Sequence, residues 1–151
     1  MRKLKYLVIH CTDTPAGRNV SADDIRRWHT DPKPKGRGWR QVGYQAMFHL
    51  NGEIEELVPN NNDSFVDSWE VTNGAFGFNS VSIHWVYVGG KGGDTRTTAQ
   101  KKAMEVDVKA FHAQHPDVKI IGHHHLNAGK ACPSFDVQAW LKEIGINQQL
   151  Q

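Results

Sequence analysis

Three short runs of aliphatic and β-branched residues limit how this chain of 151 residues can fold. They read LKYLVIHC, SVSIHWVYVGG and VKIIG, and they occupy residues 4–11, 80–90 and 118–122. Each run has the composition and length of a buried strand. Segments with a helical pattern alternate with them, at residues 21–30, 97–114 and 133–145. This alternation predicts an α/β fold with one central mixed sheet.

Local signals support the helices and add a hairpin. Ser21 and Asp24 form an approximate capping box, followed by an apolar stripe of Ile25, Trp28 and His29. The longer helix has small or apolar side chains at helical spacing, namely Ala99, Ala103, Val106, Ala110 and Ala113. Residues 42–50 and 53–58 flank Asn51-Gly52, a pair that favours a tight hairpin turn. Residues 59–79 are rich in Asn, Ser, Gly and Asp and are expected to form a long loop.

Composition favours one globular domain over residues 1–151, with its core at about residues 4–146. Hydrophobic residues make up 38% and charged residues 23%, and the net charge is +2. Nothing here indicates a nucleic-acid or membrane partner, and the basic run at residues 33–40 reads as an exposed loop. Two cysteines make no disulfide framework, which suggests free thiols and a reducing compartment. The N-terminal apolar run is too short for a signal peptide, so we expect synthesis in the cytoplasm.

Candidate metal ligands follow two of the expected strands. His10 lies at the end of the first strand, His123 follows Gly122 at the end of the last, and Cys132 comes nine residues later. Loops beyond the carboxyl ends of strands converge in α/β sheets, and two imidazoles with a thiolate suit zinc. The spacing alone is a weak signal, because nine histidines allow many such combinations. A histidine that satisfies a strand end and an inert buried thiol remain the alternatives.

Motifs along nearly the whole chain strengthen this interpretation. They read LVIHCTDT, WHTDP…GW, VGYQAMFHLNGEI, NSVSIHWVYVGG, DTRTTAQ and GHHHLNAGKACPSFD. In order and spacing, from about residue 6 to 141, the chain resembles the zinc-dependent N-acetylmuramoyl-L-alanine amidases. That family includes small phage lysins and the peptidoglycan recognition proteins. The resemblance implies a single α/β domain with a mixed five-stranded sheet flanked by helices.

The resemblance also implies roles for particular residues. His10, His123 and Cys132 match the ligands of one zinc ion, although loop length in some relatives would select His124 instead of His123. Tyr44 and Lys130 match catalytic residues that would stabilise the developing oxyanion while zinc activates water. Without the resemblance, Tyr44 would read as a core aromatic residue and Lys130 as a surface lysine. Three residues are expected to contact substrate: Trp39, Asn79 and His124.

Some positions depart from the family pattern. Gln45 stands where many relatives have a histidine, and His84 replaces a small glycine in its strand. The loop before Asn79 lacks the histidine that many relatives place near the metal, and that space is expected to be filled by Trp69, Thr72 or Asn73. We expect these changes to alter substrate contacts or pH dependence without removing the metal.

The expected function is zinc-dependent hydrolysis of the amide between N-acetylmuramic acid and L-alanine in bacterial peptidoglycan, by a monomeric phage lysin or wall-remodelling enzyme. Such an enzyme would act on the wall after release or export. A wall-binding module without catalysis is one alternative, but binding-only relatives generally lose the cysteine that is present here as Cys132. A lysin that also restrains a phage RNA polymerase is another, and no residue pattern identifies a surface for it.

Overall fold

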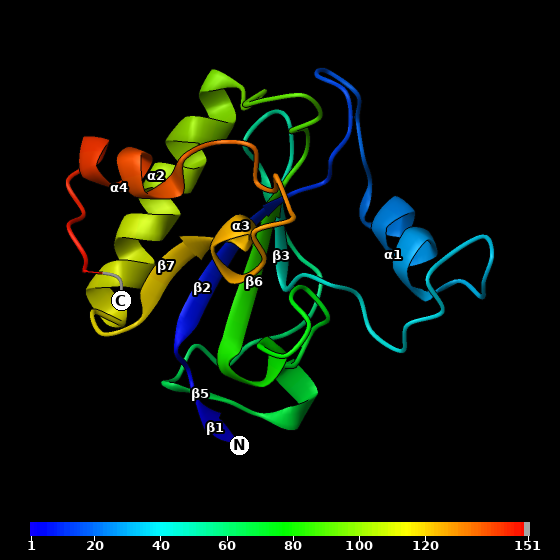
Figure 1. The fold of residues 1–151 in the computed structure, drawn as a ribbon, viewed down its shortest axis with the longest axis horizontal. Coiled ribbons are helices and arrows are strands. Elements are labelled where there is room, and N and C mark those ends of the chain that lie inside the picture. The colour runs from blue at the N-terminus through cyan, green and yellow to red at the C-terminus, as the bar shows by residue number, and fades with distance from the viewer. Residues whose placement is uncertain (150–151) are drawn as a thin grey trace.

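The computed structural model describes residues 1–149 and contains a central five-stranded sheet in the order β4-β3-β6-β2-β7 (Figure 1). The strands are β2 (Tyr6–Cys11), β3 (Ala46–Phe48), β4 (Ile54–Glu56), β6 (Ser82–Tyr87) and β7 (Lys119–Gly122). The central strand β2 pairs in parallel with β6 and β7, β3 is parallel to β6, and only β4 is antiparallel to its neighbour. The predicted α/β fold with a mixed five-stranded sheet is confirmed.

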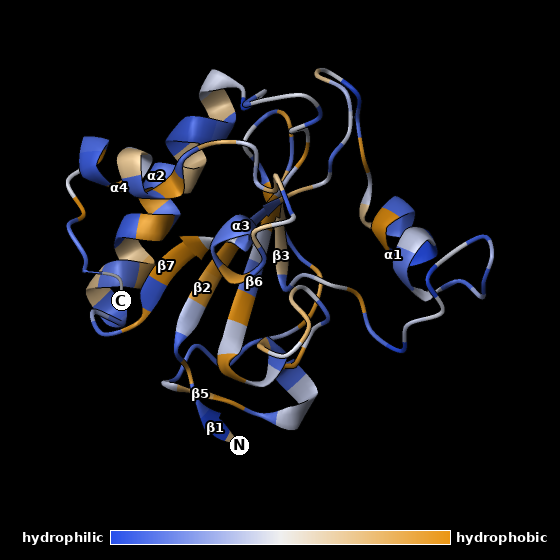
Figure 2. Cartoon of the chain, viewed as in Figure 1, coloured by the Kyte–Doolittle hydropathy of each residue, from blue (hydrophilic) through white to orange (hydrophobic). Residues whose placement is uncertain are grey.

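The helices cover the two faces of this sheet differently. They are α1 (Ala22–Thr30), α2 (Thr98–Gln114), the short α3 (His123–Leu126) and α4 (Val137–Glu143). Helices α2 and α4 lie on one side, whereas α1 lies at the other side of the molecule (Figure 1). Figure 2 shows hydrophobic segments along β6 and β7 and on α2. None of the helices in residues 1–149 is long and apolar enough to cross a bilayer.

Alternation along β2 and β6 divides the core into two clusters and places the histidines. Leu7 and Ile9 of β2 pack in the cluster that α2 and α4 cover. Side chains of successive strand residues point to opposite faces, so His10 projects to the other face. By the same rule His84 of β6 shares that face with Val86, which packs in the second cluster with α1. His10 and His84 therefore lie on one face of two adjacent strands.

Local signals predicted the starts of α1 and α2, but they did not predict the start of α4 or the buried face of α2. Helices α1 and α2 begin where expected, at capping boxes of Ser21 with Asp24 and of Thr97 with Gln100. The third expected helix, at residues 133–145, begins only at Val137, where the Asp136 side chain caps it. The alanine-rich stripe that identified α2 is not its buried face, because Val106 is 60% exposed and Ala99 and Ala110 are also exposed. Alanine favours a helix through its backbone propensity wherever it points. The residues that α2 buries are Gln100, Met104 and Val108.

The hairpin forms as expected, whereas the long loop is more ordered than its composition suggested. Strands β3 and β4 pair antiparallel across the Asn51-Gly52 turn. Within the predicted loop, β5 (Phe65–Val66) pairs with β1 (Arg2–Lys3), and 3₁₀ turns span Ser68–Glu70 and Asn79–Val81. The fully buried Glu70 holds this segment, since its carboxylate accepts hydrogen bonds from the backbone N–H groups of Asn61 and Asp67.

Replacing Gln100 by leucine should test the buried polar contact that joins α2 to the sheet. The Gln100 amide donates to the carbonyl oxygens of Phe48 and Val88 and accepts the backbone N–H of Thr97, so Gln100→Leu removes all three contacts. We expect the free energy of unfolding to fall by about 2–3 kcal/mol, measured by urea denaturation. Lys101→Ala, at an exposed neighbouring position, is the matched control and should change it by less than about 0.5 kcal/mol. Equal effects of the two substitutions would contradict this role for Gln100.

Candidate active site

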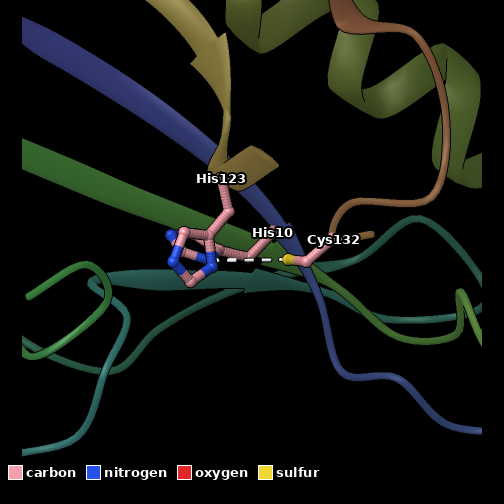
Figure 3. Close-up of side chains that lie close together, drawn as sticks. All are labelled: His10, His123 and Cys132. Carbon is pink, nitrogen blue, oxygen red and sulfur yellow. Dashed lines mark hydrogen bonds between the residues drawn. The ribbon is translucent and has the colours of Figure 1, made fainter. Parts of the chain in front are cut away.

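Two histidines and a cysteine from distant parts of the chain meet at one edge of the sheet (Figure 3). His10 lies near the end of β2, His123 begins α3 directly after β7, and Cys132 follows in the loop between α3 and α4. Because β2 and β7 are adjacent and parallel, their carboxyl ends bring these residues together. One donor atom from each of the three side chains lies within 4.8 Å of the other two.

The spacing of the donor atoms fits a tetrahedral metal ion. His10 Nδ1 lies 3.6 Å from Cys132 Sγ. A tetrahedral zinc ion with usual bond lengths places a nitrogen and a sulfur ligand about 3.6 Å apart. The donor set, two imidazoles and a thiol with room for a fourth ligand, is typical of catalytic zinc sites. The cluster is therefore a possible metal site.

The geometry favours His123 over His124 as the third member of this cluster. The ring of His124 turns instead against the chain at Gly122, where an added Cβ would lie 2.9 Å from the His124 ring. The backbone N–H of His124 donates to the carbonyl oxygen of Cys132 at 2.9 Å. Through these contacts His124 holds the loop that carries Cys132 against β7. His124 is not among the residues that line the cavity described below.

Further hydrogen bonds fix the position of the cysteine. The backbone N–H of Cys11 donates to Cys132 Sγ at 3.2 Å. On the other side of the loop, the hydroxyl of Tyr87 donates to the carbonyl oxygen of Pro133 at 2.6 Å. A residue of β2 thus holds the sulfur of Cys132, and a residue of β6 holds Pro133. Strand β2, which carries His10, and the adjacent strand β6 therefore also fix the position of Cys132.

Burial keeps the imidazoles of the cluster in the neutral form that binds metals. It lowers the pKa of His10 well below its ordinary value, and neighbouring histidines, His84 first, lower it further. Burial likewise lowers the pKa of His123, helped by the positive charge of Lys130. The hydrogen bond with the Cys11 side chain and burial raise the pKa of Cys132. A bound cation would oppose this shift, because it stabilises the thiolate.

A cavity of about 510 Å³ opens beside the cluster and contains both expected catalytic residues. The ring of Tyr44 lies 5.1 Å from that of His10, centroid to centroid, and burial raises the pKa of Tyr44. The Tyr44 hydroxyl therefore stays protonated and can donate a hydrogen bond. Lys130 also lines this cavity. It is exposed and lies in the loop that carries Cys132.

Aromatic residues, called here the aromatic wall, also line the cavity. His29 of α1 packs against Tyr44 and Trp39, and its Nδ1 accepts a hydrogen bond from the backbone N–H of Gly43 at 2.9 Å. The guanidinium of Arg37 lies over the Trp39 ring at 5.1 Å. The remaining aromatic residues that line the cavity are Trp28 and the fully exposed Phe76. The sequence interpretation assigned His29 to helix packing only and did not single out Arg37 or Phe76, which no local motif marks.

The residues expected near the cavity from the sequence are distributed unevenly. Trp39, Asn73 and Asn79 line it, whereas Trp69 and Thr72 do not. Thr72 is buried and donates its hydroxyl to the carbonyl oxygen of Gly43, and Trp69 is 53% exposed elsewhere. The amide oxygen of Asn79 is already engaged by the chain's own groups, the backbone N–H of Ala75 and the ring of His84.

The chain is similar to known proteins in both sequence and fold. Residues 1–135 match the family described as N-acetylmuramoyl-L-alanine amidase. The endolysin of Enterobacteria phage K11 is 33% identical over 139 residues, which cover 89% of this chain and 83% of that protein. The Ph2119 endolysin of a Thermus scotoductus bacteriophage has 25% identity and a TM-score of 0.75 over 96% of this chain and 86% of that chain. Bumblebee PGRP-SA shares the fold, with 19% identity and a TM-score of 0.70 over 94% and 82% of the two chains.

The fold, the cavity and the family match together define a hydrolase of the amidase class. The chain belongs to the N-acetylmuramoyl-L-alanine amidase family. It is a peptidoglycan amidase, and the resemblance found in its motifs is confirmed.

Acid should destabilise the metal-free protein through His29. Burial and the Arg37 charge lower the pKa of His29 to about 4, below the value of about 6.5 in the unfolded chain. The unfolded state therefore takes up the proton first, so stability present above pH 6.5 is lost as the pH falls toward 4. Between about pH 7 and pH 5 the free energy of unfolding should fall by about 1–2 kcal/mol more in the wild type than in His29→Asn, measured with chelator present.

The asparagine retains an acceptor for the Gly43 N–H but cannot be protonated at these pH values. His125→Asn, at an exposed position, is the matched control and should follow the wild type. If His29→Asn shows the same pH dependence as the wild type, His29 is not the source of the acid sensitivity.

Proposed function

We propose that this amidase depends on zinc and that His10, His123 and Cys132 hold one zinc ion. The observation that carries the proposal is the convergence of the three donor atoms, with the His10 Nδ1 to Cys132 Sγ distance of 3.6 Å that a tetrahedral ion requires. Neutral imidazoles support the same assignment, because a protonated histidine cannot bind a metal. When bound, zinc would supply a water molecule of lowered pKa and a Lewis acid for the amide carbonyl.

Tyr44 and Lys130 would act on the carbonyl oxygen of the substrate amide. The protonated Tyr44 hydroxyl can donate a hydrogen bond from the cavity floor beside His10. Lys130 lines the same cavity and brings a positive charge close to His123. Preorganised donors of this kind stabilise negative charge that develops in the transition state. We therefore assign both residues to oxyanion stabilisation.

The substrate that this cavity fits is the peptidoglycan strand at the junction of sugar and stem peptide. Trp39 offers an apolar ring at the wall, and Arg37 over it offers a positive charge for a carboxylate of the peptide. Asn79 lines the cavity but uses its amide oxygen within the protein, and His124 contacts the chain at Gly122. We assign the substrate-contacting role to Trp39 and not to Asn79 or His124. A role in bacterial lysis is supported by relatives that are named endolysins.

Removing the cysteine ligand should remove metal and activity together. Purified wild-type protein should contain about one zinc ion per chain and release free amino termini from peptidoglycan without new reducing sugar ends. Cys132→Ser should lose zinc and reduce turnover by at least about 10³-fold, because the Lewis acid and its activated water are lost. Zinc content is measured by atomic emission, and turnover by labelling new amino termini.

Cys11 provides a matched control for this substitution. It is the other cysteine, directly after His10, and its backbone N–H is the group that donates to Cys132 Sγ. Cys11→Ala retains that N–H and should retain zinc and most of the activity. Full activity of Cys132→Ser, or of wild-type protein from which a chelator has removed all metal, would refute the proposed mechanism.

Tyr44 and Lys130 should affect turnover without affecting the metal. Tyr44→Phe and Lys130→Met should each lower kcat/KM by on the order of 10²-fold, because each removes one donor to the developing oxyanion. Zinc content should stay at the wild-type level. Lys142→Met, which removes a lysine from α4, is the control and should leave both quantities unchanged. Loss of zinc in the Tyr44 or Lys130 variants would instead show a role in metal binding.

A further inference from the structure

We propose that His84 and Asn79 form a positioning relay that holds His10 in the tautomer with a free Nδ1, the atom that faces Cys132. This inference rests on the proposed metal site. The relay runs from the 3₁₀ turn at Asn79–Val81, through His84 on β6, to His10 on β2. No catalytic role is assigned to either residue, since both would act through His10.

The direction of the relay is set at Asn79. The Asn79 Oδ1 atom accepts the backbone N–H of Ala75 at 2.8 Å, and a backbone N–H can only donate. This contact identifies the atom as the amide oxygen rather than the amide nitrogen. The same oxygen lies 3.0 Å from His84 Nε2. Since the oxygen can only accept, His84 Nε2 carries the proton.

The proton on His84 Nε2 determines the role of the other ring nitrogen of His84. A neutral imidazole with its proton on Nε2 has a lone pair on Nδ1. The side chain of His84 is fully buried, and no ion pair within residues 1–149 involves it, so a charged ring would be uncompensated. His84 Nδ1 is therefore an acceptor.

The third step determines the tautomer of His10. His84 Nδ1 lies 2.8 Å from His10 Nε2, and an acceptor at that distance requires the proton to be on His10 Nε2. His10 Nδ1 then keeps its lone pair, which faces Cys132 Sγ at 3.6 Å. Partners of this kind orient metal-binding histidines and typically change metal affinity by about 10–100-fold.

The surrounding packing leaves room for the His84 ring and holds it in place. An added Cβ at Gly74 would lie 2.4 Å from the ring, so only glycine leaves this space open. The backbone N–H of His84 donates to Gln45 Oε1 at 2.6 Å, which ties its strand position to the segment before β3. A glycine at position 84 could not make the contact with His10.

The test compares zinc affinity and the His10 tautomer in variants at position 84. His84→Leu removes the acceptor at similar size, and His84→Asn replaces Nδ1 by a side-chain oxygen at the same position along the chain. We expect zinc affinity, measured by competition with a chromophoric chelator, to fall by about 10–100-fold in His84→Leu and to recover in His84→Asn. Ser82→Ala, on the same strand and face, is the matched control and should bind zinc as the wild type does.

The tautomer is read separately in metal-free protein by ¹H–¹⁵N correlation of the imidazole nitrogens. Wild-type His10 should carry its proton on Nε2, and the Nδ1-protonated form should appear in His84→Leu. If that variant does not fold, Asn79→Ala tests the same relay from the cavity side, where it should mix the tautomers of His84 and His10. A wild-type His10 protonated on Nδ1, or zinc affinity in His84→Leu within about twofold of the wild type, would overturn the relay.

These readouts distinguish failure of the relay from failure of the proposed function. If wild-type protein does not bind zinc, or Cys132→Ser binds it as tightly, the assignment of the metal site is wrong, and the relay has no metal ligand to orient. If zinc binds through Cys132 while the His84 variants leave both affinity and tautomer unchanged, only the relay is wrong.

Discussion

The imidazole of His10 is the point on which the site depends. It lies near the carboxyl end of the central strand β2, 1% exposed, and both of its ring nitrogens face other side chains. Nδ1 faces Cys132 at 3.6 Å, and Nε2 contacts His84 at 2.8 Å. The parallel pairing of β2 with β6 and β7 makes this possible, because it places one neighbouring strand on each side of the histidine.

Burial of the histidines affects both the stability of the fold and the chemistry of the site. The same desolvation that keeps His10, His84 and His123 neutral also makes their protonation unfavourable in the folded state. A site prepared for metal binding at neutral pH is therefore costly to keep folded in acid. The cavity is open on its other side, where Lys130 and the aromatic wall are reached from solvent. Tight packing behind the ligands and an open front suit a fixed metal site that receives a polymeric substrate.

The sequence predicted the features that depend on local patterns. The buried strands, the capping box of α1, the range of α2 and the Asn51-Gly52 hairpin follow from periodicity and turn chemistry within a few residues. The buried face of α2 was not predictable from alanine spacing, since Met104 and Val108 are buried by contacts with distant strands. The pairing of β5 with β1 was missed for the same reason, because it joins the loop to the first residues of the chain.

The candidate site shows the same division. Motifs identified the residues that the structure brings together, His10, His123 and Cys132, and the geometry then separated His123 from His124. The sequence also marked His84 as unusual, but it could not show that Gly74 leaves space for its ring. Asn79 was expected to contact substrate; it lines the cavity, and its oxygen also contacts the backbone N–H of Ala75 and the ring of His84. Such contacts between a loop and a strand are set by the packed fold and leave no local pattern.

X-ray absorption at the zinc edge of the purified protein would test the metal assignment most directly. One sulfur ligand at about 2.3 Å, with nitrogen or oxygen ligands at about 2.0–2.1 Å completing four-coordination, is the expected result. Cys132→Ser protein purified in the same way should hold no zinc and should therefore give no zinc-edge signal. A spectrum of the wild-type protein with nitrogen and oxygen ligands only would contradict the assignment of Cys132, and with it the three-residue metal site.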